Sequence, residues 1–439
     1  MGRRRKSGLL VVWMNGERVG EWHQRAGGHE FRYDESWVDS AAARPISLSL
    51  PLRPSREPYR IGVEAFFDNL LPDSRQIRER LQRRFAAESS GAFDLLWEIG
   101  RDCIGALQLL PADATPSKVK AITGERLTTS DVAAVLSDAV NPFMGQERTA
   151  SEFRISLAGA QEKTALLRHE GAWHLPTGAT PTTHIFKLPL GSNQQGIDLS
   201  SSVENEWLCA RVLEELNLPV ASCDIATFGE QRVLVVERFD RKLSADGTWW
   251  VRLPQEDFCQ ATATAPVFKY ESDGGPGIPQ IMDILLGSQQ ARTDREIFMR
   301  TQFVFWLLAG IDGHAKNFSI THLAGGDYRL APNYDVLSAH PIIGRGRGKL
   351  AVQKVKMAMA LSGKNRHYLW QEMRVRHWLE TAKRCGITNM QEIMGEITSA
   401  VPDAVQRVGN RLPRAVPVEL AESILEGVQL AAKQVKREL

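Results

Sequence analysis

An apolar run that leads into a polar loop is the feature of this sequence that most restricts its fold. Phe303 to Leu308 (FVFWLL) is entirely apolar, and Ile311 to Asn317 (IDGHAKN) follows almost directly. Large apolar residues in an unbroken run belong in a core, and polar groups fixed beside a core are costly unless they bind a ligand or perform chemistry. We therefore predict a buried helix end that delivers a polar loop to a site.

Three side chains in and after this loop have the chemistry that phosphoryl transfer from ATP requires. Asp312 would receive the proton of the nucleophile, while Asn317 and Asp335 would hold Mg²⁺ against the phosphates. The spacing Asp-x-x-x-x-Asn is also that of the kinase catalytic loop. Because so short a pattern recurs by chance, an alternative stays open in which Asp312-Gly313 is a turn and Asn317 a cap.

The composition sets outer limits on fold and function. With 439 residues the chain is too long for one core, which indicates two or three domains. Its net charge of +2 excludes nucleic-acid binding by bulk charge alone. No stretch approaches the ~18 apolar residues of a membrane span, and the five cysteines form no Cys-x-x-Cys pair. We expect a cytoplasmic protein with reduced thiols and no membrane partner.

The first 110 residues are typical of a small α+β unit. The basic start, Met1 to Lys6, precedes an apolar run that is too short for a signal peptide, and Asn15-Gly16 then indicates a hairpin turn. The polar, proline-containing stretch 111–120 indicates a domain boundary. We predict strands over 9–14, 17–22, 31–33, 46–50 and 104–110, and helices over 64–71, 73–85 and 93–99.

The order of elements after residue 150 gives a second indication of function. A small-residue loop follows the first strand, Lys187 lies near the end of a later strand, and Glu206 lies on a helix. The last strand runs into Glu237 to Asp240, and longer helices follow. We predict strands over 153–157, 164–167, 173–175, 183–188, 221–228 and 232–237, a helix over 200–216, and domains over 1–110, 111–240 and 241–439.

That order matches the working parts of a protein kinase. Lys187 would neutralise phosphate charge and Glu206 would pair with it, while Ala158 to Lys163 would offer backbone N–H groups to the phosphates. Glu237 to Phe239 would bind adenine. Taken singly, each part has a plain alternative: a snorkelling lysine, a solvated glutamate, or a Glu237-Arg238 surface pair. The joint order favours the kinase interpretation.

Longer strings extend this interpretation over nearly the whole chain. They are Phe31 with Tyr33, ARPISLSL (43–50), FFDNLLPDS (66–74), EIGR (98–101), FRISLAGAQEKTALL (153–167), TPTTHIFKLP (180–189), VERFDR (236–241), RLPQED (252–257), KYESDGGPG (269–277), DGHAKNFS (312–319) and YD (334–335). Together they resemble the HipA family of serine/threonine kinases, the toxins of bacterial type II toxin–antitoxin pairs. The resemblance implies an α+β fold in which a small mixed N-terminal subdomain precedes a protein-kinase-like core with a mainly helical C-terminal lobe.

The resemblance also assigns roles to single residues. It implies that Asp312 is the proton acceptor, that Asn317 and Asp335 are the Mg²⁺ ligands, and that Lys187 contacts phosphate. Ser156 matches the autophosphorylated serine of the family. The ATP site would be completed by Ala158, Gly159, Ala160, Gln161, Glu162, Lys163, Glu237, Arg238, Phe239, His314, Ala315, Lys316 and Tyr334.

Partners follow from the same resemblance. The family's best-known target is glutamyl-tRNA synthetase, whose loss stalls translation and leads to growth arrest and persistence. A helix-turn-helix antitoxin neutralises the kinase, and the pair represses its own operon. Lys383 aligns with a family DNA contact, although a solvated helix face is the plain alternative there.

Two other functions stay open at this point. One is a non-catalytic operon corepressor that works only through its antitoxin, and the other is a small-molecule or lipid kinase. The intact set of Asp312, Asn317 and Asp335 favours a catalytic protein, and the lack of a basic cluster longer than Arg3 to Lys6 weighs against a lipid substrate.

The loop spacing generates a first prediction. Replacing Asp312 by Asn should leave folding and Mg-ATP binding intact and slow phosphate transfer at least ~10²-fold, because general-base help is lost. A nucleotide titration and a transfer assay with labelled ATP measure the two effects separately. Wild-type turnover in the variant would remove Asp312 from the mechanism.

Overall fold

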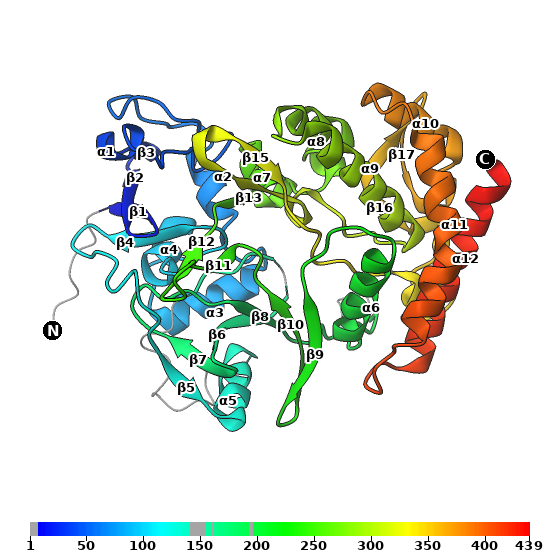
Figure 1. The fold of residues 1–439 in the computed structure, drawn as a ribbon, viewed down its shortest axis with the longest axis horizontal. Helices are drawn as coiled ribbons and strands as arrows, with labels where there is room; N and C mark the ends of the chain where they lie inside the picture. The colour runs from blue at the N-terminus through cyan, green and yellow to red at the C-terminus, as the bar shows by residue number, and fades with distance from the viewer. Residues whose placement is uncertain (1–7, 141–154, 160, 193–195) are drawn as a thin grey trace.

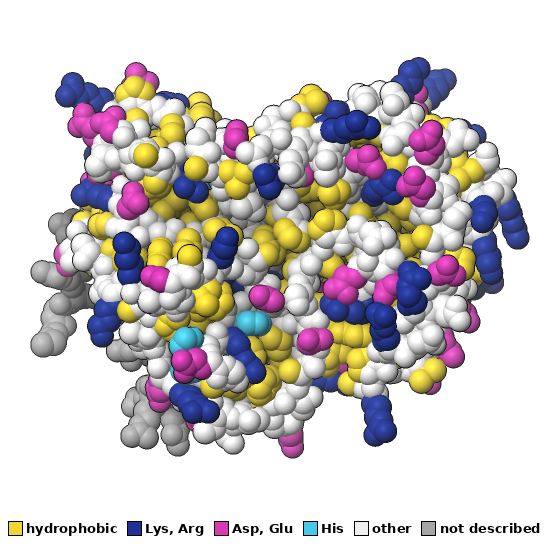
Figure 2. Space-filling view, viewed as in Figure 1, with side chains coloured by type: hydrophobic (Ala, Val, Ile, Leu, Met, Phe, Trp, Pro, Cys, Tyr) yellow, Lys and Arg dark blue, Asp and Glu magenta, His cyan; other side chains and the backbone are white. Residues whose placement is uncertain are grey.

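The computed structural model describes residues 8–140, 155–159, 161–192 and 196–439. The fold is α+β, as predicted: the N-terminal subdomain and a β-rich lobe lie on one side, and the long C-terminal helices lie on the other (Figure 1). No helix within these ranges is long and apolar enough to cross a membrane. On the face shown in Figure 2, basic and acidic side chains are interspersed and form no large patch of one sign.

The N-terminal subdomain is built on a four-stranded antiparallel sheet in the order β3-β2-β1-β4. The predicted hairpin turn is confirmed, because Asn15 and Gly16 have φ values of 49° and 89°, as a type I′ turn requires. Trp22 stacks on Phe67, with ring centroids 4.1 Å apart, and fixes the core. The elements are β1 (Leu9–Met14), β2 (Glu17–Arg25), β3 (Gly28–Tyr33), α1 (Glu35–Val38), α2 (Val63–Asp68), α3 (Arg75–Phe85), α4 (Ala92–Ile99) and β4 (Leu107–Pro111).

The predicted strand over 46–50 is wrong. Ser47 and Leu50 form only an isolated bridge with each other. The Ser47 hydroxyl and the Leu48 N–H both donate to the Glu256 carboxylate, in the second half of the chain. The polar residues alternate with apolar ones here because they bind a distant buried carboxylate. A period-two pattern looks the same in such a segment as in a strand.

The β-rich lobe contains a six-stranded sheet in the order β5-β7-β6-β8-β10-β9. The predicted strand over 153–157 is not part of it: residues 153 and 154 lie outside the described ranges, and Ile155 bridges Asp102 of the N-terminal subdomain instead. The elements are β5 (Gly124–Leu127), α5 (Thr129–Val140), β6 (Lys163–His169), β7 (Ala172–Pro176), β8 (His184–Lys187), α6 (Ser202–Glu215), β9 (Cys223–Phe228) and β10 (Gln231–Glu237).

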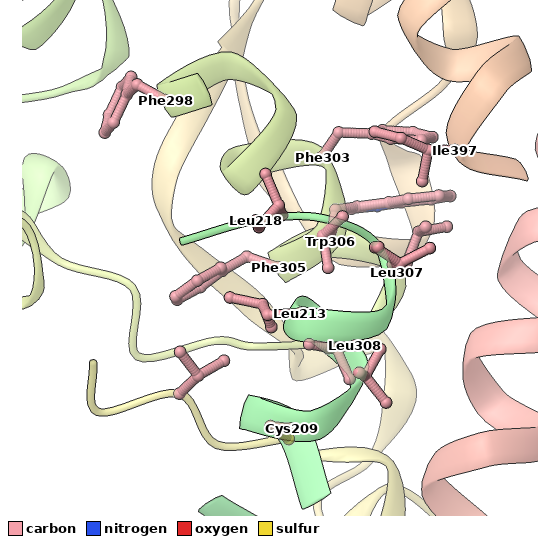
Figure 3. Packing of buried hydrophobic residues seen from close by; sticks show 14 of the residues in the cluster. Cys209, Leu213, Leu218, Phe298, Phe303, Phe305, Trp306, Leu307, Leu308 and Ile397 are labelled. Carbon is pink, nitrogen blue, oxygen red and sulfur yellow. The ribbon is translucent and has the colours of Figure 1, made fainter. Parts of the chain in front are cut away.

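The helical lobe surrounds the apolar run that opened the sequence. Helix α9 (Ala291–Leu307) ends at this run, and its side chains pack against Leu213 of α6 and Ile397 of α11 (Figure 3). Phe303 through Leu308 are all buried, so the predicted buried helix end is confirmed. The other helices are α7 (Phe258–Ala261), α8 (Ile278–Ile284), α10 (Val375–Arg384), α11 (Met390–Gly409) and α12 (Val418–Glu438).

Three small antiparallel sheets complete the second half of the chain. Strands β13, β14 and β15 form the largest of them and flank the polar loop that follows α9. The strands are β11 (Arg241–Leu243), β12 (Trp250–Arg252), β13 (Gln255–Asp257), β14 (Ser319–His322), β15 (Tyr328–Leu330), β16 (Lys356–Ser362) and β17 (Arg366–Leu369).

A cluster of buried charges, which we name the Asp102 cluster, joins the N-terminal subdomain to the rest of the molecule. Asp102 lies 2.9 Å from the Arg241 guanidinium and 3.0 Å from that of Arg252, while Arg238 donates to Asp240 at 2.7 Å. All five side chains are buried. Burial favours the neutral acid, but the three guanidinium groups hold the pKa of Asp102 well below its usual range. The surface alternative for Arg238 is therefore wrong.

Replacing Asp102 by Asn should destabilise the fold by about 3–5 kcal/mol, because it leaves buried guanidinium groups without their shared counter-charge. Urea unfolding measures the free energy of unfolding. Asp246→Asn is the control, since Asp246 is an exposed loop carboxylate that bonds only to Ser244 and Thr248 nearby. An Asp102→Asn protein as stable as the control would show that the cluster does not hold the subdomain.

Candidate active site

A pocket lies where the N-terminal subdomain, the six-stranded sheet and the helical lobe meet. It brings together most of the residues that the sequence predicted for one site. Gln161, Glu162, Glu206 and Ala315 are not part of the lining, and Ala160 lies outside the described ranges. The predicted residues in the lining are Ala158, Gly159, Lys163, Lys187, Glu237, Arg238, Phe239, Asp312, His314, Lys316, Asn317, Tyr334 and Asp335.

Lys187 is held between two carboxylates. It lies on β8, in the interior of the sheet, and its ammonium group donates to Glu206 on α6 at 2.5 Å and to Asp335 at 2.7 Å. Burial opposes the charged ammonium, but Asp335 and Glu206 hold the pKa of Lys187 above its usual value. The predicted Lys187–Glu206 pair is thus present, and both side chains are buried rather than solvated.

The polar loop after α9 is closed by its own amide side chain. Asn317 donates through Nδ2 to the backbone carbonyl of Asp312 at 2.7 Å, and the His314 N–H donates to the same oxygen at 2.8 Å. The turn alternative therefore describes real contacts, yet the amide oxygen of Asn317 stays available to a ligand. The Asp312 carboxylate is 52% exposed, and the hydroxyl of Tyr270 donates to it.

The segment after β10 leaves few backbone donors for a ligand. The N–H of Glu237 donates to Ser222 and that of Arg238 donates to Thr183, at 2.8 and 2.9 Å. Within the described part of the chain, the Phe239 N–H makes no such bond. The Phe239 ring lies 5.8 Å from the ring of Tyr334, so two aromatic faces border the pocket beside this free donor.

The loop at residues 158–163 is anchored from both sides. Gly159 has a φ of 105°, a backbone conformation that residues with a side chain rarely adopt, so the loop favours glycine there. Lys163 donates to the Ala158 carbonyl at 2.8 Å, Gln161 donates to Leu188 at 2.5 Å, and Glu162 pairs with an arginine on α3. The side chains of Gln161 and Glu162 thus hold the loop in place.

Two further predicted functional residues, Ser156 and Lys383, are not among the lining residues. Ser156 is completely buried, and its hydroxyl donates to the backbone carbonyl of Leu70 at 2.7 Å. Lys383 is exposed at the end of α10, in the helical lobe. The proposed roles of Ser156 and Lys383 therefore do not follow from a place in the pocket lining.

Sequence reasoning assigned no role to three further residues of the lining, which are Asp73, Lys269 and Asp257. Asp73, from the N-terminal subdomain, accepts from Lys269 at 2.8 Å and from Lys316 at 2.6 Å. Asp257 is buried, which raises its pKa to about 7. Each of the three residues belongs to a string that carries the family resemblance. Membership in those strings was the one sequence signal that could have pointed to them.

The donor set fits a nucleotide with Mg²⁺. Asn317 offers a neutral amide oxygen and Asp335 offers a carboxylate, and both are hard oxygen ligands of the kind that Mg²⁺ prefers. Burial favours the neutral acid, but Lys187 and Lys163 hold the pKa of Asp335 well below its usual range. Asp335 therefore keeps its negative charge at neutral pH.

These features define a protein-kinase-like fold with an added N-terminal subdomain: a sheet lobe with a Lys–Glu pair, a connecting segment, and a helical lobe with an Asp-x-x-x-x-Asn loop. Two family profiles match the chain. The HipA N-terminal domain matches residues 10–110, and the HipA-like C-terminal domain matches residues 155–405. The chain belongs to the HipA family, as the resemblance predicted.

Individual relatives agree with this assignment. A Sinorhizobium fredii protein named "Putative kinase Y4mE" is 34% identical over 419 residues, which cover 92% of each chain. The "Serine/threonine-protein kinase toxin HipA" of Shewanella oneidensis is 27% identical over 321 residues, 70% of this chain and 69% of that protein. A solved Shewanella oneidensis complex of HipA, HipB and operator DNA matches with a TM-score of 0.77 at 19% identity, covering 98% of this chain and 97% of that one. It shows the shared fold.

The lysine between two carboxylates generates a third prediction. Lys187→Ala should weaken nucleotide binding and transfer together, because a cation beside the phosphates is lost in both the ground state and the transition state. Glu206→Ala should have a milder effect in the same direction, since it removes only one of the two groups that position Lys187. Nucleotide titration and label transfer measure both effects. A silent Glu206→Ala would show that the pair has no part in binding.

Proposed function

We propose that this chain is an ATP-dependent serine/threonine protein kinase that acts as the growth-arresting toxin of a toxin–antitoxin pair. One observation carries the proposal: Lys187, held by Glu206 and Asp335, lies in the same pocket as Asp312 and Asn317. Those are the charges that phosphoryl transfer uses, assembled from separate elements of the chain.

The chemistry follows from the positions of these groups. Lys187 binds the α- and β-phosphates, and the loop over 158–163 offers backbone N–H groups to the phosphates. Asp312 accepts the proton of the acceptor hydroxyl as that oxygen bonds to the γ-phosphorus, while the bond to the β,γ-bridging oxygen breaks and ADP leaves. Mg²⁺ held at Asn317 and Asp335 would neutralise charge on the phosphates.

Adenine packs against the aromatic side chains at the connecting segment. The Phe239 N–H is the free donor there, and Phe239 and Tyr334 border the pocket with their rings. His314 lies edge-on to Tyr270, with ring centroids 5.1 Å apart, beside the Asp312 carboxylate. Different side chains therefore lie at the two ends of the pocket: Phe239 and Tyr334 at the adenine end, and His314, Tyr270 and Asp312 at the acceptor end.

The partners are proposed from the relatives. A helix-turn-helix antitoxin neutralises the kinase and binds operator DNA together with it; the Shewanella oneidensis HipA was solved in a complex with HipB and its operator DNA. Lys383, exposed on α10, contacts that DNA. The protein substrate is glutamyl-tRNA synthetase, and the site of action is the cytoplasm. These statements go beyond the geometry of the pocket and rest on family membership.

The decisive experiment incubates the protein with γ-labelled ATP and a cell lysate, and identifies the labelled protein and residue. Label in one lysate protein on Ser or Thr is the expected result, and the Asp312→Asn variant should give none. A protein that binds ATP yet labels no protein, while repressing its operon with an antitoxin, would instead establish the corepressor function. Label found in a small molecule or lipid would establish the other alternative.

Ser156 is proposed as an autophosphorylation site that switches the kinase off. Its hydroxyl is buried against Leu70, two residues before Ala158, so the segment must leave this position before it can be modified. A phosphate adds about two negative charges beside the loop assigned to ATP, and it cannot return to a fully buried site. The displaced loop no longer holds the phosphates of ATP.

The switch gives a fourth prediction. Mass spectrometry should find phospho-Ser156 in active protein and not in Asp312→Asn protein, and the phosphorylated form should bind ATP more weakly. Because the loop cannot both cover ATP and reach its own Asp312, transfer should occur between molecules, with an initial rate per enzyme that rises with enzyme concentration. Phosphorylated protein that binds ATP as tightly as unmodified protein would refute the switch and leave the kinase assignment intact.

A further inference from the structure

The N-terminal subdomain places one carboxylate inside the pocket. Asp73 lies between α2 and α3, and its two oxygens accept from Lys269 at 2.8 Å and Lys316 at 2.6 Å. Asp73 lies 196 residues before Lys269 and 243 residues before Lys316. The contact therefore forms only when the N-terminal subdomain folds against the helical lobe. We name these three residues the Asp73 cluster.

The Asp73 cluster has the opposite charge balance to the group around Lys187. Around Lys187, two carboxylates contact one ammonium and Lys163 also acts on Asp335, and the carboxylates supply oxygens for a cation such as Mg²⁺. In the Asp73 cluster, two ammonium groups share one carboxylate, which leaves positive charge for an anion. Lys187, Asp335 and the Asp73 cluster line the same pocket, so the pocket provides one place for a metal and another for phosphate oxygens.

The Asp73 cluster lines the same pocket as the acceptor carboxylate. Lys316 directly precedes Asn317 in the loop that carries Asp312. Lys269 directly precedes Tyr270, whose hydroxyl donates to Asp312. Each lysine is therefore next in sequence to a residue that contacts Asp312: Lys316 precedes Asn317, and Lys269 precedes Tyr270.

Each ammonium group keeps donors for a ligand. An ammonium has three N–H donors. Lys269 donates one to Asp73, and Lys316 donates one to Asp73 and a weaker one to the Asn69 carbonyl at 3.4 Å. The carboxylate fixes the direction of both side chains without using all their donors, which is the arrangement that preorganised charge stabilisation requires.

Asp73 holds the phosphate loop as well. Its backbone N–H donates to the Gly159 carbonyl at 3.1 Å, and Pro72 forms a bridge with Gly159. One residue of the N-terminal subdomain thus contacts the loop over the phosphates through its backbone and two lysines through its side chain.

We infer that Asp73 is a positioning residue that holds Lys269 and Lys316 so that both bind the transferred phosphoryl group beside Asp312. The inference deepens the proposed kinase function and rests on it. It makes the N-terminal subdomain a component of the phosphoryl-transfer site, because neither lysine is otherwise fixed by a carboxylate in the described part of the chain.

The test replaces Asp73 by Asn, which keeps the shape and removes the charge. The rate constant kcat for label transfer should fall about 10²-fold, the scale for loss of positioning, while the Kd for ATP stays within a few-fold, because Lys187 and the connecting segment are untouched. The control is Asp34→Asn, since Asp34 lies in the same subdomain, where it caps α1 and pairs with Arg18 at 3.1 Å. The control should keep wild-type kcat.

A double-mutant cycle separates positioning from general stability. In a Lys269→Met/Lys316→Met background, adding Asp73→Asn should cost little further rate, because the groups through which Asp73 acts are already gone. An equal loss of kcat in both backgrounds, or an equal loss in the Asp34→Asn control, would overturn the inference. If wild-type protein shows no Asp312-dependent transfer, the proposed function itself is wrong, and the inference is overturned with it.

Discussion

The burial of Asp102 among three arginines is the interaction on which the rest of the structure depends. Asp102 belongs to the N-terminal subdomain, whereas Arg238 lies in the connecting segment, Arg241 begins β11 and Arg252 lies on β12. A buried charge without its partner costs several kcal/mol, so this contact is either complete or strongly unfavourable. It fixes the subdomain in one orientation, and that orientation brings Asp73 into the pocket and Leu70 onto Ser156.

The parts of the fold that the sequence predicted correctly are those governed by short-range rules. The Asn15-Gly16 turn specifies its hairpin through backbone conformation alone. The apolar run 303–308 could only be buried, and so the loop after it was placed at a core. Lys187 and Glu206 were paired correctly because strand and helix periodicity, together with the order of elements, placed them on facing elements.

The parts that sequence reasoning missed are long-range contacts between ordinary-looking residues. Residues 46–50 alternate like a strand, yet their polar groups bind Glu256 more than 200 positions away. Asp73 precedes a helix cap and has the appearance of a surface turn residue, and nothing local indicates two lysines around it. Arg238 adjoins a glutamate and so resembled half of a surface pair, although its true partners are Asp102 and Asp240. In each case the residue that determines the contact is distant in sequence, so the contact cannot be predicted from the local pattern.

The complete burial of Ser156 has a kinetic meaning. Under the proposed switch, a second molecule can reach this hydroxyl only while the segment is open, so the rate of modification would be the intrinsic rate multiplied by the open fraction. An opening free energy of about 3 kcal/mol would keep roughly one molecule in 150 open at any moment. The packing around Leu70 would then set the delay before inactivation. The length of that delay would depend on the local stability of one buried hydrogen bond and its surroundings.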